Sequence, residues 1–305
     1  MKLAAAVTLP GRGGTLDERI AWADDAVARA AAAGAGLVVL PEATIPGYSH
    51  VRADCGDVAR TWALGAARRG LAVAVGYLDG DGCWLGVADP DGRFTAYRKR
   101  FPSPAEGRVW RGGTDAVIVD TPVGRVGLLI CADVLQLDAW RPYVGRVDAV
   151  AVAAAWPDYQ GRLERTPRLA RPALRWLFEG SVPYRDALLV RASAAVGAPV
   201  VFADASGPVF PHSLPEILRP NPDILGSTTA APSPRSRLPG FDLGFPGSRG
   251  PLEGRESFSA GTRIVSDSVH VGDLVVAPVG RRAPGEPLRH VGRWGPFAAV
   301  YRRVG

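Results

Sequence analysis

The chain has 305 residues, of which 47% are apolar and 22% are charged. This composition fits one large domain or two ordinary ones, and it excludes a disordered chain or a coiled coil. The formal net charge is +6, yet only two of the 36 basic residues, Lys2 and Lys99, are lysines. An ammonium is a compact charge whose pKa the surroundings can tune, whereas a guanidinium stays protonated, so Lys99 is a candidate for chemistry.

The basic balance, with an isoelectric point near 9.6, raises the question of a nucleic-acid or membrane partner. The arginines are scattered, however, and prolines at 167 and 172 interrupt their densest run, Arg162–Arg175. Such a run is more typical of a solvated face than of an anion-binding surface. No apolar run in the sequence approaches the ~18 residues of a membrane span. We therefore expect neither a nucleic-acid partner nor a membrane partner.

The three cysteines, Cys55, Cys83 and Cys131, are too few and too irregularly spaced for a disulfide framework or a zinc site. Their number favours a reducing compartment. The opening residues MKLAAAVTL carry no cleavage pattern typical of a secretion signal. We expect a cytoplasmic protein.

The first predicted elements alternate strand, helix and strand. An apolar run over Leu3–Leu9 predicts a strand, and Thr15 with Glu18 forms a capping box for a helix that Gly34 ends. The next strand, Gly36–Leu40, is apolar without interruption, which is typical of a strand buried on both faces. It ends at Pro41 and Glu42, so a carboxylate lies at the carboxyl end of a buried strand.

The following residues predict a helix over Val58–Arg69, a strand over Leu71–Tyr77, and a meander with Asp-Gly turns that leads to Lys99. The strand Val126–Ile130 then ends at Cys131. This mixture of alternating elements and hairpins favours a layered α/β protein with mixed sheets. Further strands are predicted over 116–120, 149–155, 188–192, 200–203, 262–265 and 273–277.

Two late segments differ from the rest. Residues 204–257 are rich in Pro, Gly, Ser and Arg, which predicts a long loop excursion of the kind that often forms a lid. The tail carries Trp294, Phe297 and Tyr301 and is too apolar to be left in water. We expect it to pack on the body or on a neighbouring subunit.

Three residues able to act as an acid, a base or a nucleophile each follow a predicted strand: Glu42, Lys99 and Cys131. Open α/β sheets commonly place their chemistry at such strand ends. A nucleophilic thiol needs a base, and the tetrahedral intermediate of acyl transfer needs fixed positive charge or N–H donors. A buried Glu42 could supply the base and Lys99 the positive charge. Taken singly, each has a plainer explanation: a buried small hydrophobe, a paired carboxylate and a surface cation.

Rival sites are weakly marked. The four histidines do not accompany a G-x-S-x-G elbow, which disfavours a Ser-His-Asp hydrolase. The glycine-rich stretch over 11–14 lacks the Gly-Lys-Ser/Thr of a phosphate loop and predicts a turn.

Three segments resemble, in order and spacing, the signature segments of the nitrilase superfamily of carbon–nitrogen hydrolases. They are LVVLPEATIPGY (Leu37–Tyr48), YRKRFPSPAEG (Tyr97–Gly107) and VGLLICADVLQLDAWR (Val126–Arg141). Residues 153–157 and 258–264 are similar to later strands of that family. The resemblance covers residues 1–280, which we take as the hydrolase domain, and leaves 281–305 as a C-terminal tail.

The resemblance implies a four-layer α-β-β-α sandwich, a homodimer formed through helix contacts or a higher homo-oligomer, a small-molecule substrate, and no metal or cofactor. The sequence departs from the nitrile-cleaving members at Tyr97-Arg98-Lys99 and at Ala132-Asp133. It is therefore closer to the amidase and carbamoyl-amide hydrolase branches.

Carried over to this sequence, Glu42 matches the general base, Lys99 the cation that stabilises the tetrahedral intermediate, and Cys131 the nucleophile. Glu106 matches a second glutamate that orients the lysine and the substrate. The N–H of Ala132 would complete the oxyanion hole.

The same resemblance places Tyr48 and Trp156 against the substrate. The implied activity is hydrolysis of a linear amide or carbamoyl compound through a Cys131 thioester. Two alternatives stay open: amide-forming acyl transfer to an amine, if a lid over the site excludes water, and a catalytically silent scaffold.

Overall fold

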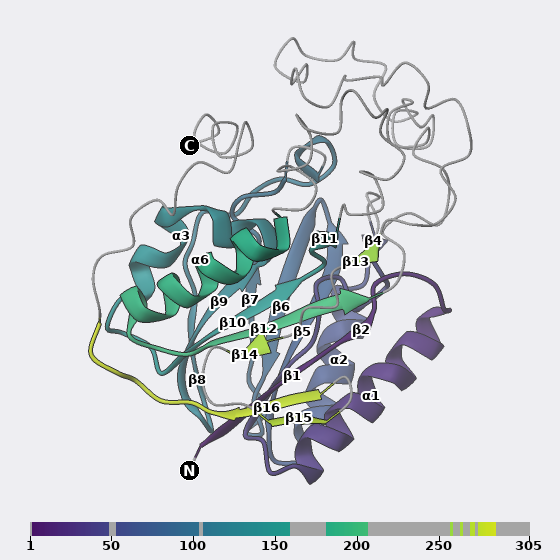
Figure 1. The fold of residues 1–305 in the computed structure, drawn as a ribbon. Helices are drawn as coiled ribbons and strands as arrows, with labels where there is room; N and C mark the ends of the chain where they lie inside the picture. Colours follow the sequence, from purple (N-terminus) through teal and green to yellow (C-terminus); the bar gives the residue numbers. More distant parts are fainter. Residues whose placement is uncertain are drawn as a thin grey trace, which may run out of the picture.

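The computed structural model describes residues 2–48, 53–103, 106–158, 181–206, 257–258, 263–264, 269–271 and 274–284. In these segments two mixed sheets stack face to face, with helices α1 (Leu16–Ala32) and α2 (Gly56–Ala67) on one side. Helices α3 (Leu137–Trp140) and α6 (Ser181–Val196) lie on the other side (Figure 1). The expected α-β-β-α layer order is confirmed.

The first sheet has the strand order β15-β16-β1-β3-β5-β6-β7, with β4 also paired to β5. Its centre, β1, β3 and β5, is parallel, and its remaining pairs are antiparallel. Two antiparallel steps from β5 to β7 give these two strands the same direction, so the carboxyl ends of β3 and β7 lie at one edge. The strands are β1 (Leu3–Val7), β3 (Leu37–Val39), β4 (Ala53–Asp54), β5 (Ala72–Gly80), β6 (Gly82–Ala88), β7 (Phe94–Arg98), β15 (Val269–Val271) and β16 (Leu274–Pro278).

The second sheet has the order β14-β12-β10-β9-β8, with β2 paired to β12. Strands β9, β10 and β12 are parallel, so their carboxyl ends also share an edge. A small pair, β11 (Pro157–Asp158) with β13 (Ser257–Phe258), continues beyond β10. The strands are β2 (Leu9–Pro10), β8 (Ile118–Thr121), β9 (Gly124–Ile130), β10 (Ala149–Ala154), β12 (Val200–Ser206) and β14 (Arg263–Ile264).

The uninterrupted apolar strands are buried on both faces, as their composition predicts. Successive residues of β1 and β3 contribute to two different cores. Ala4 and Leu37 belong to the core between the sheets, and Ala5 and Val38 belong to the core under α1 and α2. Burial on both faces therefore holds the strand ends, where the candidate residues lie, between two packed layers.

Helix α1 begins as predicted. The Thr15 hydroxyl accepts from the Glu18 N–H at 3.3 Å, and the Glu18 carboxylate accepts from the Thr15 N–H at 2.6 Å. The chain leaves this helix through Gly34, whose φ of +75° is a left-handed conformation that favours glycine. The capping box is confirmed on both of its hydrogen bonds.

The predicted strand over 188–192 is wrong, because these residues lie inside α6. Their buried positions, Leu188, Leu189 and Ala192, continue at Ala195 and Val196 with helical spacing of three and four. A short apolar run does not distinguish a strand from a buried helix segment. The spacing of three and four over residues 188–196 identifies this one as a helix.

The predicted strand over Leu3–Leu9 is divided between the sheets, since β1 belongs to the first sheet and β2 to the second. Strand β12 extends to Ser206, so the predicted excursion that begins at Asp204 overlaps its last three residues. Residues 207–256 of that excursion, residues 285–305 of the tail, and the arginine run over 162–175 lie outside the described residues.

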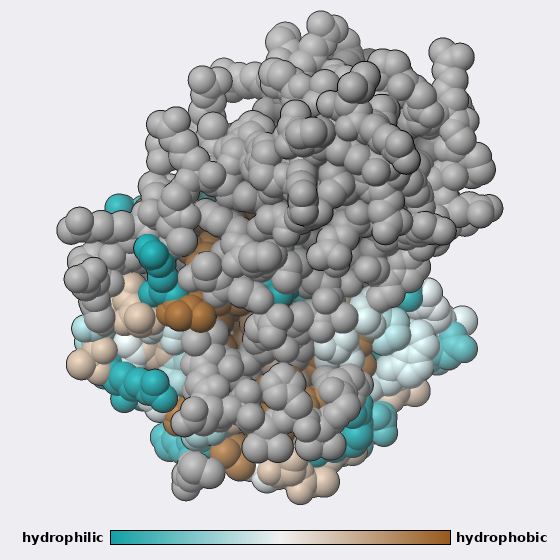
Figure 2. Space-filling view, in the orientation of Figure 1, coloured by the Kyte–Doolittle hydropathy of each residue, from teal (hydrophilic) through white to brown (hydrophobic). Residues whose placement is uncertain are grey.

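Hydrophilic side chains of the described part are dispersed over the face drawn in Figure 2 and do not gather into one patch. Among the helices of the described segments, none has both the length and the apolar composition needed to cross a bilayer.

Candidate active site

Glu42 lies in the turn that follows β3 and is completely buried. Its backbone N–H donates to the Ala154 carbonyl of the opposite sheet at 3.3 Å, so the turn bridges the two sheets. Gly76 on β5 permits this position. A β-carbon there would overlap the Pro41 carbonyl and lie 2.8 Å from the Glu42 Cα.

Lys99 follows β7, and its side chain is 1% exposed. The Nζ atom donates to Glu42 Oε1 at 2.6 Å and to Glu106 at 2.8–2.9 Å. The sole lysine away from the amino terminus is therefore the buried link between two carboxylates. The family resemblance implies a lysine beside these two carboxylates.

Glu106 begins the 3₁₀ helix η1 (Glu106–Arg108), and it too is 1% exposed. Its Oε2 accepts from the Ser103 N–H at 2.6 Å, and its Oε1 accepts from the Tyr48 hydroxyl at 2.9 Å. Tyr48, predicted to contact the substrate, therefore lies beside the carboxylates. Its contact in the structure is a hydrogen bond that holds Glu106.

Cys131 begins the 3₁₀ helix η2 (Cys131–Leu135) at the end of β9. Its φ of +41° is unusual for a residue with a side chain and places the thiol on a sharp strand-to-helix turn. The next residue, Ala132, is also buried. Its N–H lies on the same turn, where the proposed oxyanion donor is expected.

Asp133 connects this turn to the segment that carries Lys99. It accepts from the Ile130 N–H at 2.9 Å, the Tyr97 hydroxyl at 2.7 Å and the Phe101 N–H at 2.8 Å. Sequence reasoning noted Asp133 only as a departure from the nitrile-cleaving members. Its role as a clamp depends on contacts that no spacing in the sequence predicts.

The residues that follow β10 complete the surroundings of Glu42. The Ala155 N–H donates to Glu42 Oε2 at 3.2 Å, and the Trp156 N–H donates to Asp204 at 2.8 Å. Trp156 is 4% exposed, and its indole nitrogen is a buried donor that has no partner among the described residues. The structure places it one residue from the Glu42 contact.

Cys83 is a further neighbour that sequence reasoning missed. Its thiol donates to Glu42 Oε1 at 3.5 Å, and its backbone carbonyl accepts from the Lys99 N–H at 2.9 Å. Its only sequence signal is its place on the strand before the one that leads to Lys99.

Burial raises the pKa of Glu42 to about 7. The charge of Lys99 opposes this shift, and the negative charge of Glu106 adds to it. Burial would lower the pKa of Lys99, but Glu106 and Glu42 raise it well above its ordinary value. Burial and then Glu42 raise the pKa of the Cys131 thiol. The resting site therefore holds a protonated thiol, an ammonium, and a carboxyl group that ionises near neutral pH.

Hydrogen bonds bring together the predicted residues Glu42, Lys99, Glu106 and Tyr48. The Cys131 thiol lies close enough to these groups to affect the pKa of Glu42. Within the described segments, no group of three His, Cys, Asp or Glu side chains could hold a metal ion. A carboxylate base beside a thiol, with an ammonium fixed next to both, can carry out nucleophilic acyl transfer.

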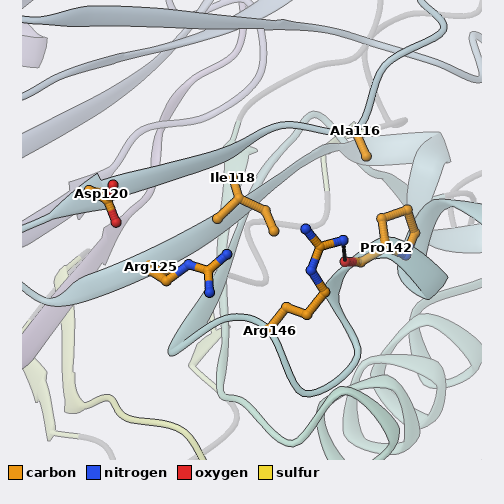
Figure 3. Close-up of a pocket in the computed structure, with 6 residues that line it drawn as sticks. All are labelled: Ala116, Ile118, Asp120, Arg125, Pro142 and Arg146. Atoms are coloured by element: carbon orange, nitrogen blue, oxygen red, sulfur yellow. Dashed lines mark hydrogen bonds between the residues drawn. The ribbon is translucent and has the colours of Figure 1, made fainter.

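A separate surface groove lies away from these residues, between the β8–β9 hairpin and the turn after α3 (Figure 3). None of the predicted site residues contributes to it. It is lined by Ala116, Ile118, Asp120, Arg125, Pro142 and Arg146.

A sequence model of the family described as carbon-nitrogen hydrolase matches residues 3–167, which is more than half of the chain. The chain belongs to the carbon–nitrogen hydrolase family, and the resemblance to the nitrilase superfamily is confirmed. The match spans the segments that carry Glu42, Lys99, Glu106, Cys131 and Trp156.

A nitrilase of Talaromyces marneffei is 29% identical over 173 residues. The match covers 47% of this chain, and the chain spans about half, 52%, of that relative's length.

Solved structures of an amidase from Nesterenkonia sp. AN1 share the fold. A mutant that carries acrylamide, added at its active-site cysteine, is 24% identical with a TM-score of 0.54, covering 68% of this chain and 80% of that one. A mutant in complex with butyramide is 23% identical with a TM-score of 0.54, covering 68% of this chain and 77% of that one.

Proposed function

We propose that this protein hydrolyses the C–N bond of a linear amide or carbamoyl compound through a thioester on Cys131. The observation that carries the proposal is the buried Lys99 ammonium, fixed between two carboxylates of which one, Glu42, also interacts with the Cys131 thiol. Burying this charged set is costly, which supports a chemical role for it beside the Cys131 thiol.

In the first half-reaction Glu42 accepts the thiol proton while the Cys131 sulfur forms a bond to the substrate carbonyl carbon. The carbonyl oxygen takes the electron pair, and Lys99 with the Ala132 N–H stabilises the resulting oxyanion. The intermediate collapses, the C–N bond breaks, and the leaving amine takes the proton from Glu42. An acyl thioester stays on Cys131.

In the second half-reaction Glu42 removes a proton from water, and the hydroxyl attacks the thioester carbon. The C–S bond then breaks, and the proton returns from Glu42 to the sulfur. One residue serves as base in both halves and as acid between them, so its pKa needs to lie near the working pH. A pKa of about 7 for Glu42 meets this requirement.

Two features bear on the substrate. Ala132 is small at a position next to the nucleophile, which leaves room for an acyl group. The indole N–H of Trp156 is buried without a partner in the described part, so an acyl group with a hydrogen-bond acceptor there would satisfy it. We infer that primary amides and N-carbamoyl compounds with a polar acyl chain are preferred over nitriles.

The test is a panel of primary amides, N-carbamoyl compounds and nitriles assayed for ammonia release, with Cys131→Ala as the control. We expect release from amides or carbamoyl compounds, and a mass increase on Cys131 that equals the acyl group when the reaction is quenched. Ammonia release by the Cys131→Ala protein would contradict the mechanism.

The same assay decides between the other activities. Addition of hydroxylamine diverts the thioester to a hydroxamic acid, with release of the Cys131 thiol, if the site favours acyl transfer to an amine. If no compound yields ammonia or an adduct, the chain is a catalytically silent scaffold.

We also propose that the protein is a cytoplasmic homodimer. Val144 and Val190 are exposed large apolar residues on the outer helical layer over the second sheet. Light scattering of the purified protein tests this: a dimer that Val190→Lys converts to a monomer is expected, and a monomeric wild type would contradict it.

A further inference from the structure

A second buried ion pair, between Arg185 of α6 and Asp204 of β12, lies next to the candidate active site. Both side chains are fully buried, and the Arg185 Nη1 lies 3.1 Å from Asp204 Oδ2. The guanidinium also lies over the Phe202 ring, 5.0 Å from its centroid. The mechanism described above uses neither residue.

The other oxygen of Asp204 binds backbone. Oδ1 accepts from the Trp156 N–H at 2.8 Å and from the Ala205 N–H at 3.0 Å. The ladder between β10 and β12 ends at the pair Ala154 and Asp204, so Trp156 lies just past it. Beyond the last backbone pair of β10 and β12, the Asp204 side chain therefore supplies the hydrogen bond that fixes the chain where it leaves β10.

The residue between the ladder and Trp156 is Ala155, and its N–H points at the catalytic groups. It donates to Glu42 Oε2 at 3.2 Å, and it also lowers the pKa of the Cys131 thiol against the effect of burial. Because Ala155 and Trp156 share a peptide bond, a constraint on the Trp156 N–H limits the orientation of its neighbour.

We propose that Asp204, held in place by Arg185, is a positioning residue that keeps the Ala155 N–H directed at Glu42 and Cys131. Arg185 supplies the positive charge opposite the buried Asp204 carboxylate, and Asp204 supplies the acceptor. Buried ion pairs can often be replaced by apolar residues without loss of stability, so geometry is the stronger reason for this pair.

Two double variants separate the acceptor from the charges. Arg185→Met with Asp204→Asn removes both charges and keeps an oxygen for the Trp156 N–H. Arg185→Met with Asp204→Leu removes both charges and the oxygen at nearly the same side-chain volume. The two proteins are matched in charge and size, and they differ in whether residue 204 can accept.

The measurement is the rate at which iodoacetamide alkylates Cys131 as a function of pH, followed by mass spectrometry of the peptide. Cys131→Ala gives the background from Cys55 and Cys83, and thermal melting reports folding. This reaction needs the thiol and Glu42 but no identified substrate. Only the consequence for turnover depends on the proposed function, so a failure to hydrolyse amides and a failure of this inference give different results.

We expect the asparagine double variant to keep the wild-type rate and pH midpoint. We expect the leucine double variant to react at least about tenfold more slowly near neutral pH, with its midpoint moved upward, because Glu42 loses an N–H donor. Identical pH profiles for the two proteins would overturn the inference, even if both melt below the wild type.

If the leucine variant does not fold, Asp204→Ser replaces it and is compared with Asp204→Asn. Serine is polar but too short to reach the Trp156 N–H, so the same difference in profile is expected. Equal profiles in this second pair would also overturn the inference.

Discussion

The protein buries two sets of ionised side chains side by side, and they differ in charge balance. Among the described residues, Lys99 lies between two carboxylates, Glu42 and Glu106, whereas Arg185 pairs with one, Asp204. In the first set burial raises the pKa of Glu42 to about 7, while the charge of Lys99 opposes this shift and the charge of Glu106 adds to it. In the second set, within the described segments, the carboxylate is paired with the Arg185 guanidinium and accepts from backbone N–H donors. The unbalanced set can exchange a proton near neutral pH, and the balanced set can hold a backbone in place.

Removing the cation from the unbalanced set has the largest expected effect. Lys99→Met leaves two carboxylates facing each other without a counter-ion, so we expect loss of turnover and about 3–5 kcal/mol less unfolding free energy. Protonation relieves the repulsion, so the loss of stability is smaller at acidic pH and grows as the pH rises. Chemical denaturation at acidic and at alkaline pH measures this.

Lys2→Met is the matched control, because Lys2 is exposed at the start of the chain. We expect it to keep both activity and stability. A Lys99→Met protein that is as stable as the Lys2→Met protein at alkaline pH would show that the carboxylates do not depend on this cation.

The next effect separates the two carboxylates. Glu42→Gln keeps the shape but removes the base, so we expect a fall in kcat of about 10²–10⁴. Glu106→Gln keeps the base and a polar partner for Tyr48, so its loss is smaller. Both variant proteins should be equally well folded, as judged by thermal melting. An equal loss of kcat in the two variants would mean that the base is not assigned correctly.

The pH dependence sharpens the same distinction. A base with a pKa of about 7 is ionised above that pH, so kcat/KM should rise as the pH increases through about 7 and then level. Glu106→Gln removes a negative charge that raises the pKa of Glu42. The acid limb of this variant should therefore move to lower pH, and an upward or absent shift would contradict the coupling.

The sequence predicts one of these two sets far better than the other. Glu42, Lys99 and Cys131 each follow a strand, which the local apolar pattern predicts. Because the carboxyl ends of these strands share an edge, the three residues come together. Glu106 depends on a signature segment that extends beyond any single element. The layered α/β class could likewise be predicted from the alternation of elements, because hydrophobic periodicity is a local signal.

The balanced set could not be predicted, because its contacts join residues far apart in sequence. Arg185 lies in a helix that the apolar run over 188–192 makes resemble a strand, and Asp204 lies where a loop was predicted. Pairing the two charges requires knowing that α6 packs against β12. The clamp formed by Asp133 has the same origin, since its donors Tyr97 and Phe101 lie more than 30 residues earlier in the chain.

The smallest expected effect concerns Cys83, which touches the unbalanced set without adding charge. Its S–H is a weak donor to Glu42 Oε1 at 3.5 Å, and this bond favours the ionised carboxyl group. Cys83→Ala should therefore raise the pKa of Glu42 slightly. On the acid limb of the pH profile, it should lower kcat/KM by no more than about tenfold. Cys83→Ser keeps a donor and should restore the wild-type profile. If alanine and serine have the same profile, Cys83 acts only by filling space, and burial together with the charges of Lys99 and Glu106 sets the pKa of Glu42.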